Sequence, residues 1–225
     1  MTEVQTSPGR KRSAGLSLSE VIPAVERRPP DPQPANRAPA PGDLQLVQAL
    51  VNSFHNLDTR REEFDSPAGL TDWLIRRELL DPGERLTHAD LTRVLDVREG
   101  LRALMYANNH EPVEQDSIER MNRALRAPGL AVQLDASARP DFGSARRDLD
   151  SALALIATIV AVAQLDGRFA RLKACPGHDC GWAFYDSSRN QASGWCSMQI
   201  CGQRAKARAY RRRRTGRQPK ARRTP

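Results

Sequence analysis

The segment Cys175-Pro-Gly-His-Asp-Cys180, followed after fifteen residues by Cys196-Ser-Met-Gln-Ile-Cys201, contains all four cysteines of this 225-residue chain. Four residues separate the cysteines of each pair, at the wide end of the spacing found in zinc knuckles. Two such pairs joined by a short loop are typical of a tetrahedral site, because each knuckle supplies two thiolates to one ion. We therefore predict that Cys175, Cys180, Cys196 and Cys201 bind one structural Zn²⁺.

Disulfides or free thiols are the alternative interpretation of these cysteines. Disulfide frameworks are typical of small secreted chains, but residues 1–30 contain Arg10, Lys11 and Arg12 without a following apolar run, so we expect no signal peptide. His178 has knuckle spacing with Cys175 and is a rival ligand. Since four cysteines already complete a structural site, we expect His178 to be a solvated turn residue.

The segment between Ala174 and Cys201 is too short to bury a core of its own. A metal must supply the missing stability, which is about 10 kcal/mol for structural zinc sites in peptides. Four aromatic residues lie in the segment: Trp182, Phe184, Tyr185 and Trp195. We expect them to form a small core, with stacking on nucleic-acid bases as the alternative. Four thiolates on one divalent ion carry a net charge of about −2, which Lys173, Arg189 and Arg204 are expected to offset.

Positive charge is concentrated at the C-terminal end of the chain. Residues 168–225 contain 15 Lys and Arg against two acidic residues, whereas residues 1–167 contain 20 against 25. A terminal block of like charge is commonly a solvated tail, and we expect residues 215–225 to be a basic disordered tail. Beside a metal module, the same charge indicates a nucleic-acid contact.

A basic helix is predicted directly after the start of the second cysteine pair, with Ser197 as its N-cap. From Met198 onward this helix has cationic faces and no bulky apolar face, which argues against a membrane surface and favours contact with phosphates. The cations that we expect to contact nucleic acid are Arg189, Arg204, Lys206, Arg208, Arg211, Arg212, Arg213 and Arg214.

Residues 169–214 resemble a family of C-terminal zinc fingers named after a Cys-Gly-Asn-Arg tetrapeptide (CGNR). The matching motifs are Arg171-Leu172, Cys175, Cys180, Phe184-Tyr185-Asp186, Ser188-Arg189-Asn190, Trp195-Cys196-Ser197-Met198 and Cys201-Gly202-Gln203-Arg204-Ala205-Lys206. Gln203 stands where the family has Asn, so a contact made by that amide is expected to shift while metal binding is not. The resemblance implies a zinc-stabilised module that binds DNA.

The preceding residues are similar to the ABATE domain, a domain described as a stress-induced transcription regulator. The motifs that carry this similarity are Leu46-Val47 through Leu50-Val51-Asn52-Ser53, Leu70-Thr71-Asp72-Trp73-Leu74 and Leu95-Asp96-Val97-Arg98-Glu99-Gly100-Leu101-Arg102-Ala103-Leu104. The similarity implies a helical domain over residues 43–167 and a role in gene regulation, and it points to a bacterial protein.

The remaining sequence favours a mainly α protein. Residues 1–42 are rich in proline and poor in apolar residues, which predicts a disordered leader. Apolar spacing and capping residues predict helices that begin at Asp43, Ser66 and Thr87, and a further helix through residues 118–125. Alternation over residues 129–134 predicts a short strand or hairpin arm. The predicted fold is an N-terminal helical domain (43–167) followed by a small four-cysteine zinc finger with a basic helix (168–214).

A long apolar helix is expected from Ser144 to about Ala170. Its continuous apolar run, residues 152–163, is shorter than the ~20 residues that span a bilayer, so we expect a core helix. Its alanines also allow close approach of a second copy, which leaves a homodimer open.

These patterns favour a DNA-binding transcriptional regulator, with no membrane partner and a cytoplasmic, nucleoid-associated location. The helical domain would dimerise or sense a small-molecule effector of unknown identity. RNA binding by the same basic module is the alternative. We expect no enzymatic activity. Asn52, His55 and Asp58 fall at intervals of three on one predicted helix, but no second metal ligand, phosphate loop or catalytic triad accompanies them.

Overall fold

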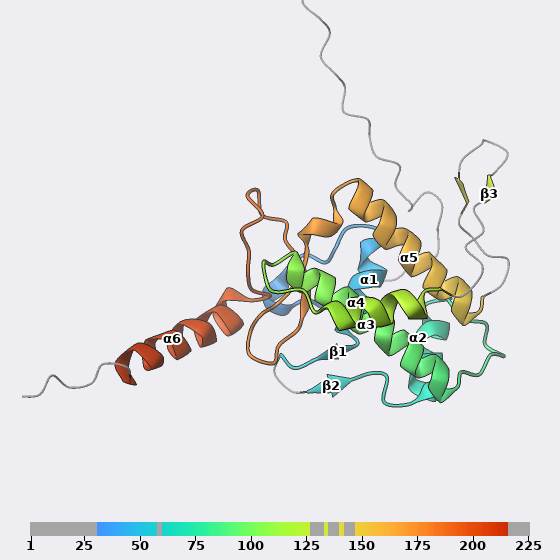
Figure 1. Cartoon of the computed structure of the whole chain (residues 1–225), viewed down its shortest axis with the longest axis horizontal. Coiled ribbons are helices and arrows are strands. Elements are labelled where there is room, and N and C mark those ends of the chain that lie inside the picture. The colour runs from blue at the N-terminus through green and yellow to red at the C-terminus, as the bar shows by residue number, and fades with distance from the viewer. Residues whose placement is uncertain (1–30, 58–59, 127–132, 135–139, 142–146, 216–225) are drawn as a thin grey trace, which may run out of the picture.

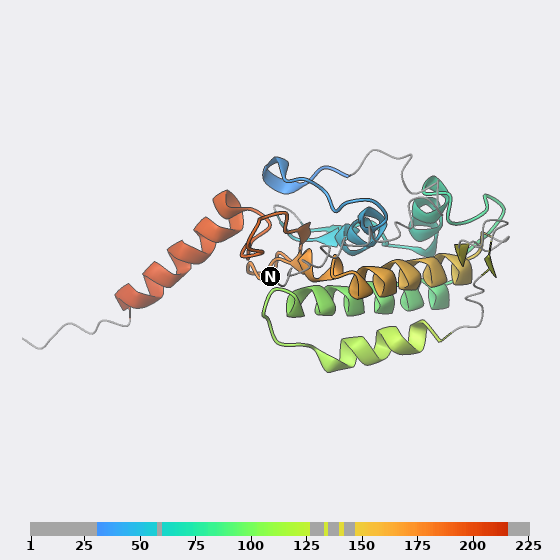
Figure 2. The same cartoon turned by 90° about the horizontal axis from the view of Figure 1, so that it is seen from above.

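The structure is a computed structural model that describes residues 31–57, 60–126, 133–134, 140–141 and 147–215. A helical body lies on one side, and a single helix, α6, projects away from it (Figures 1 and 2). The helices are α1 (Leu44–Asn52), α2 (Pro67–Arg76), α3 (His88–Ala107), α4 (Gln115–Ala124), α5 (Leu149–Leu165) and α6 (Gln203–Thr215). The predicted mainly α class is confirmed.

Short antiparallel strand pairs connect these helices. The pairs are β1 (Phe54–His55) with β2 (Arg61–Glu62), β3 (Gln133–Leu134) with β4 (Pro140–Asp141), and β5 (Leu172–Ala174) with β6 (Ala183–Tyr185). The β3–β4 pair agrees with the hairpin arm expected over residues 129–134, of which residues 129–132 lie outside the described residues.

Side-chain caps place the starts of α2 and α3 where the sequence predicts them. The Ser66 hydroxyl accepts a hydrogen bond from the Gly69 amide, with Pro67 in the first turn. Thr87 and Asp90 form a reciprocal capping box, in which the Thr87 hydroxyl accepts from the Asp90 amide and the Asp90 carboxylate accepts from the Thr87 amide. Both predicted helix starts are confirmed.

Helix α5 is shorter at both ends than expected. It begins at Leu149 because the Asp148 carboxylate caps it by accepting from the Ser151 amide at 2.9 Å. It ends at Leu165 instead of continuing to Ala170, because the chain turns through a 3₁₀ segment, Phe169–Arg171, into β5. No described helix is long and apolar enough to cross a membrane. The apolar run of α5 instead contributes Leu153, Ile156 and Ile159 to the core.

Helix α1 also stops before its apolar pattern does. Phe54 lies in β1, opposite Glu62 of β2, and not on the helix. The Ser53 hydroxyl donates to the Leu50 carbonyl at 2.7 Å, while the Arg102 guanidinium donates to the carbonyls of Val51 and Phe54. Because side chains satisfy these carbonyls, the chain can leave the helix there.

The end of α1 overturns one premise of the enzyme alternative. Asn52 is helical and His55 lies in a strand, so the two do not share a helix face, and Asp58 lies outside the described residues.

One glycine allows two neighbouring helices of the body to approach closely. A side chain at Gly100 of α3 would place its Cβ 2.3 Å from the Met121 Cβ of α4. Figure 2 shows α4 lying along α3. The glycine therefore fixes the distance between the two helices.

The core continues from the helical body into the β5–β6 pair. Buried residues of α1, α3 and α5 share one cluster with Phe169, Leu172, Ala174 and Ala183. Helix α1 contacts β6 and α3 contacts β5. The cysteine-containing segment is therefore packed onto the helical body over its first half.

The predicted disordered leader is wrong for residues 31–42, which we call the N-terminal segment; residues 1–30 lie outside the described residues. Ala40 is fully buried, and its amide donates to the Gln48 side chain at 2.8 Å. Asp31 pairs with Arg77 at 3.0 Å. The segment is ordered because its polar groups find partners on the helical body, which composition does not reveal.

Candidate metal centre and nucleic-acid interface

The four cysteine sulfurs converge on one point. All four Sγ atoms lie within 4.8 Å of one another, and the Sγ atoms of Cys180 and Cys196, and those of Cys196 and Cys201, are 3.7 Å apart. A disulfide would require about 2.05 Å. Tetrahedral coordination with bonds of about 2.3 Å places sulfurs about 3.8 Å apart. The donor set therefore fits a tetrahedral metal ion such as Zn²⁺.

The electrostatics of the cluster also call for a cation. All four cysteines are buried, with exposed fractions of 3% or less. Hydrogen bonds from Cys180 and Cys196 lower the pKa of the Cys175 thiol to about 2, and hydrogen bonds with Cys175 raise the pKa of Cys180 and of Cys196. One thiolate thus disfavours ionisation of its neighbours. A divalent ion allows all four to ionise together.

The first knuckle closes tightly around a glycine. The Cys175 amide donates to the Trp182 carbonyl and the Cys180 amide donates to the Gly177 carbonyl, both at 2.9 Å. A Cβ at Gly177 would lie 3.0 Å from the Cys201 Sγ, so the position admits no side chain without displacing the opposite knuckle.

His178, the rival ligand, is an exposed turn residue, as expected. Its side chain is 68% exposed and its Nδ1 lies 2.5 Å from an Asp179 carboxylate oxygen. It takes no part in the sulfur cluster.

The second knuckle leads directly into the basic helix. The Ser197 hydroxyl accepts from the Ile200 amide at 3.2 Å, which confirms the predicted N-cap. The Gly202 amide reaches back five residues to the Ser197 carbonyl, so the turn η4 (Met198–Gly202) is π-helical before α6 begins. The direction of α6 is therefore set where Cys201 joins the sulfur cluster.

The aromatic residues near the cysteines are mainly core, as expected. Trp182 and Phe184 are buried in one cluster with the four cysteines, and Trp195 packs against it partly buried. The Trp182 indole donates to the Gln33 side chain at 3.1 Å and packs edge-on against His55. These buried rings cannot stack on nucleic-acid bases without unfolding the module.

Lys173, which we expected to offset the charge of the metal centre, pairs with a carboxylate. Its ammonium is buried and pairs with the fully buried Asp186 carboxylate at 2.9 Å, and it also donates to the Gln191 and Ser193 carbonyls. Burial raises the pKa of Asp186, but hydrogen bonds from Ser188, Lys173 and Ser193 outweigh it and leave the pKa far below its usual value. The ion pair orders the loop between β6 and the second knuckle.

A cation that no sequence motif marks, Arg37, reaches the second knuckle from the N-terminal segment. Its guanidinium donates to the carbonyls of Tyr185, Trp195 and Cys196 at 3.1–3.3 Å. It also stacks over the Phe184 ring, 4.7 Å from the centroid. Sequence reasoning misses this arginine because its partners lie 148 to 159 residues away in the chain.

Side-chain amides join the helical body to the metal module. Asn52 pairs with both backbone groups of Ala183, and Gln48 also donates to the Ala183 carbonyl. At the end of α3, Asn108 donates to the carbonyls of Phe169 and Leu172, and Asn109 to those of Ala174 and Gly194. The Asn108-Asn109 pair, directly after a long helix, is the one local signal that could have indicated these contacts.

The cations that we expect to contact nucleic acid differ in their exposure and in the element that carries them. Lys206, Arg211, Arg212 and Arg213 are exposed on α6, Arg208 is half-buried, and Arg214 lies in the last turn. Arg189 is exposed in the loop after β6. Arg204 is also exposed, and its Nη1 donates to the Leu57 carbonyl of the helical body at 2.9 Å. Most of these cations therefore gather on the projecting helix (Figure 1).

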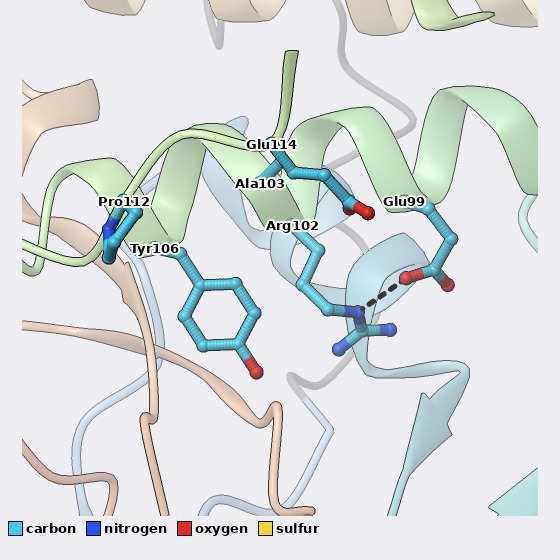
Figure 3. A pocket seen from close by; sticks show the side chains of 6 residues that line it. All are labelled: Glu99, Arg102, Ala103, Tyr106, Pro112 and Glu114. Carbon is cyan, nitrogen blue, oxygen red and sulfur yellow. Dashed lines mark hydrogen bonds and ion pairs between the residues drawn. The ribbon is translucent and has the colours of Figure 1, made fainter. Parts of the chain in front are cut away.

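A small pocket lies beside the first knuckle, lined by Glu99, Arg102, Ala103, Tyr106, Pro112 and Glu114 (Figure 3). Arg102 donates to Glu99 and to the Gly181 carbonyl. Burial raises the pKa of Glu99, but Arg102 and Arg98 outweigh it, so the pKa is lowered and the carboxylate stays ionised. Because Arg102 and Glu99 hydrogen-bond to each other, the pocket does not indicate which ligand it would bind. The small-molecule effector therefore stays a prediction.

Two family profiles match the chain, in the order that the resemblances suggest. Residues 44–165 match ABATE, described as "Putative stress-induced transcription regulator", and residues 171–214 match the CGNR zinc finger. No curated protein matches the sequence.

Proposed function

Since the chain belongs to the ABATE family of transcription regulators and carries a CGNR zinc finger, we propose that it regulates transcription by binding duplex DNA through α6. The observation that carries this proposal is the position of α6, which starts at the sulfur cluster and projects from the body (Figure 2). Most of its described cations are exposed.

The dimensions of α6 suit a DNA groove. A helix of 13 residues is about 20 Å long and 10–12 Å across with side chains. The major groove of B-DNA is about 12 Å wide. Cations on the sides of such a helix reach phosphates on both edges of the groove, and arginines along it can donate to guanine.

The ion that fits the cysteine site in this proposal is Zn²⁺. Four thiolates, closed coordination and knuckle spacing are the features of structural zinc sites. The ion would fix the turn η4, and so the point from which α6 leaves the body.

Duplex binding at stepped salt concentrations tests the proposal. With six to eight phosphate contacts, the slope of log affinity against log salt is expected near −0.9 per contact, about −5 to −7 in total. Replacing Lys206, Arg212 and Arg213 by alanine should make the slope less steep by about 3. The matched control replaces Arg60, Arg85 and Arg126, which are exposed on the body, and so makes the same change in net charge.

Equal losses in the two triple variants would mean that net charge, and not α6, attracts DNA. An affinity independent of salt would contradict the proposal outright. Competition with an RNA duplex of the same length distinguishes the RNA-binding alternative, which predicts tighter binding to the RNA.

The proposal includes no catalytic step. A regulator of this kind acts at the chromosome, which places it in the cytoplasm and associates it with the nucleoid. Dimerisation through α5 and a small-molecule effector remain predictions of the sequence.

A further inference from the structure

We propose that Arg204 is a positioning residue that fixes the direction of α6, and that the opposite face of the helix, carrying Lys206, Tyr210 and Arg213, meets the nucleic acid. This inference rests on the proposed function. It starts from the hydrogen bond that Arg204 Nη1 donates to the Leu57 carbonyl at 2.9 Å. That bond joins the first turn of α6 to the segment after β1, 147 residues earlier in the chain.

The acceptor side of this bond is firmly held. The Leu57 side chain is 7% exposed and packs in the cluster that contains the four cysteines. The neighbouring Asn56 amide donates to the Cys180 carbonyl at 3.3 Å. The preceding Phe54 carbonyl accepts from Arg102, which also donates to the Gly181 carbonyl of the first knuckle. The Leu57 carbonyl is therefore a fixed point on the helical body.

Helix α6 needs such a fixed point. Its principal packing partner is η4, the turn from which it grows. It has no buried residue after Gly202 among those that the structure describes. A helix joined to the body only through a π-helical turn could swing about that turn. The hydrogen bond from Arg204, the second residue of α6, to the Leu57 carbonyl restricts this motion, because it ties the helix to the body at a second point.

The helical repeat separates the two faces. At about 100° per residue, Arg208 and Arg211 lie within about 40° of Arg204, on the side that meets the body. Lys206, Tyr210 and Arg213 lie about 180–240° away from Arg204. Arg208, in the middle of the inward stripe, is half-buried, whereas Lys206 and Arg213 are exposed and Tyr210 is 59% exposed. Arg204 and Arg211, at the two ends of the inward stripe, are exposed as well.

Tyr210 gives this outward face a second property. Its ring is one of the few large apolar groups exposed among the described residues, and its hydroxyl can donate and accept. Flanked by Lys206 and Arg213, it presents a flat ring and a polar tip between two cations. This combination suits a groove, where the cations bind the phosphates and the ring contacts base edges or sugars.

The test compares Arg204→Met, Arg204→Lys, Lys206→Ala and Arg213→Ala in the full-length, metal-loaded chain. Methionine keeps much of the apolar stem but removes the donors, whereas lysine keeps one charged donor. The probe is a duplex of mixed sequence, about three helical turns long, titrated at several salt concentrations. Double electron–electron resonance measures the distance between the body and α6, using spin-labelled unnatural residues at the exposed positions Gln115 and Ala207. Metal content and far-ultraviolet circular dichroism establish that each variant is folded.

A positioning role predicts a wider distance distribution for Arg204→Met and its recovery in Arg204→Lys. The duplex affinity of Arg204→Met should fall about threefold to tenfold with an unchanged salt slope, since no phosphate contact is lost. Lys206→Ala and Arg213→Ala should each make the slope less steep by about 0.9 and leave the distances unchanged.

The opposite pattern would overturn the inference: a narrow distance distribution for Arg204→Met together with a slope less steep by about 0.9 would make Arg204 a phosphate contact. Unchanged slopes for Lys206→Ala and Arg213→Ala would equally overturn the assignment of the outward face. A wild-type chain with no salt-dependent affinity refutes the proposed function instead, and the distances still decide whether Arg204 positions α6.

Discussion

Asn52, the last residue of α1, pairs with Ala183 of β6 as a neighbouring strand would. Its Nδ2 donates to the Ala183 carbonyl at 2.9 Å and its Oδ1 accepts from the Ala183 amide at 2.7 Å. One side chain thus satisfies both backbone groups of a buried residue in the metal module. Gln48, one turn earlier in α1, donates to the same carbonyl at 3.1 Å.

Replacing Asn52 by Asp should destabilise the whole chain. The carboxylate keeps the acceptor but loses the donor, and it places a buried charge against the Ala183 carbonyl, at a cost of about 2–3 kcal/mol. Chemical denaturation of the metal-loaded protein measures the change. Asn190→Asp, the same substitution at an exposed position, is the control and should change stability by about 0.5 kcal/mol or less. Similar effects at the two sites would refute the role of Asn52.

Replacing Asp186 by Asn should leave Lys173 buried without its counter-ion. Removal of one partner of a buried pair costs about 3–5 kcal/mol. Because hydrogen bonds hold the folded pKa of Asp186 below its unfolded value of about 4, its contribution is fully present above that pH and is lost as pH falls through the folded pKa.

The difference in unfolding free energy between wild type and Asp186→Asn is therefore expected to be constant near neutral pH and to shrink in acid. Taking the difference removes the contribution of the metal, since both proteins keep the same four thiolates. A difference that grows on acidification would contradict the ion pair.

Replacing Cys196 by Ser should remove the metal without unfolding the helical body. Cys196 lies 3.7 Å from both Cys180 and Cys201, so its loss opens the centre of the cluster. The body retains a core formed largely by α1, α3 and α5. Elemental analysis should find about one ion per wild-type chain and none in the variant. Circular dichroism should show only a partial loss of helix, and a complete loss would mean that the body depends on the metal.

Replacing Arg37 by Ala should loosen the second knuckle. The substitution leaves three carbonyls without this donor and removes the stacking on Phe184, at a cost of about 1–3 kcal/mol. The rate at which a colorimetric chelator removes the metal should rise severalfold. Arg189→Ala, which removes an exposed arginine of the same module, is the control. Equal rates for wild type and Arg37→Ala would show that the N-terminal segment does not stabilise the metal site.

Local signals are accurate where the physical cause is itself local. The capping box of Thr87 and Asp90 and the caps formed by Ser66 and Ser197 are contacts between residues three apart, so residue type is enough to predict them. Cysteine spacing is informative for a related reason, because short loops bring each pair of thiolates together whatever surrounds them.

Predictions fail where a distant partner decides the conformation. The apolar pattern of α1 continues to Phe54, but the helix ends earlier, where Arg102 of α3 donates hydrogen bonds to the carbonyls of Val51 and Phe54. The N-terminal segment looks disordered by composition, yet Arg37 orders it through the second knuckle. The position of Lys173 beside Cys175 in the sequence suggests that its ammonium lies near the thiolates. In the structure it pairs with the Asp186 carboxylate.

The sequence by itself determined the helical class, the pairing of the four cysteines in one cluster, the start of the basic helix and the resemblance to both families, because these depend on composition and on residues close together in the chain. Only the tertiary structure decided how the metal module is held. Asn52, Arg37 and Arg102 bind backbone groups of this module that lie 79 or more residues away, and no spacing rule encodes such pairs. Arg204 illustrates the difference. Its charge in the sequence suggests that it binds a phosphate, whereas in the structure its guanidinium donates to the Leu57 carbonyl.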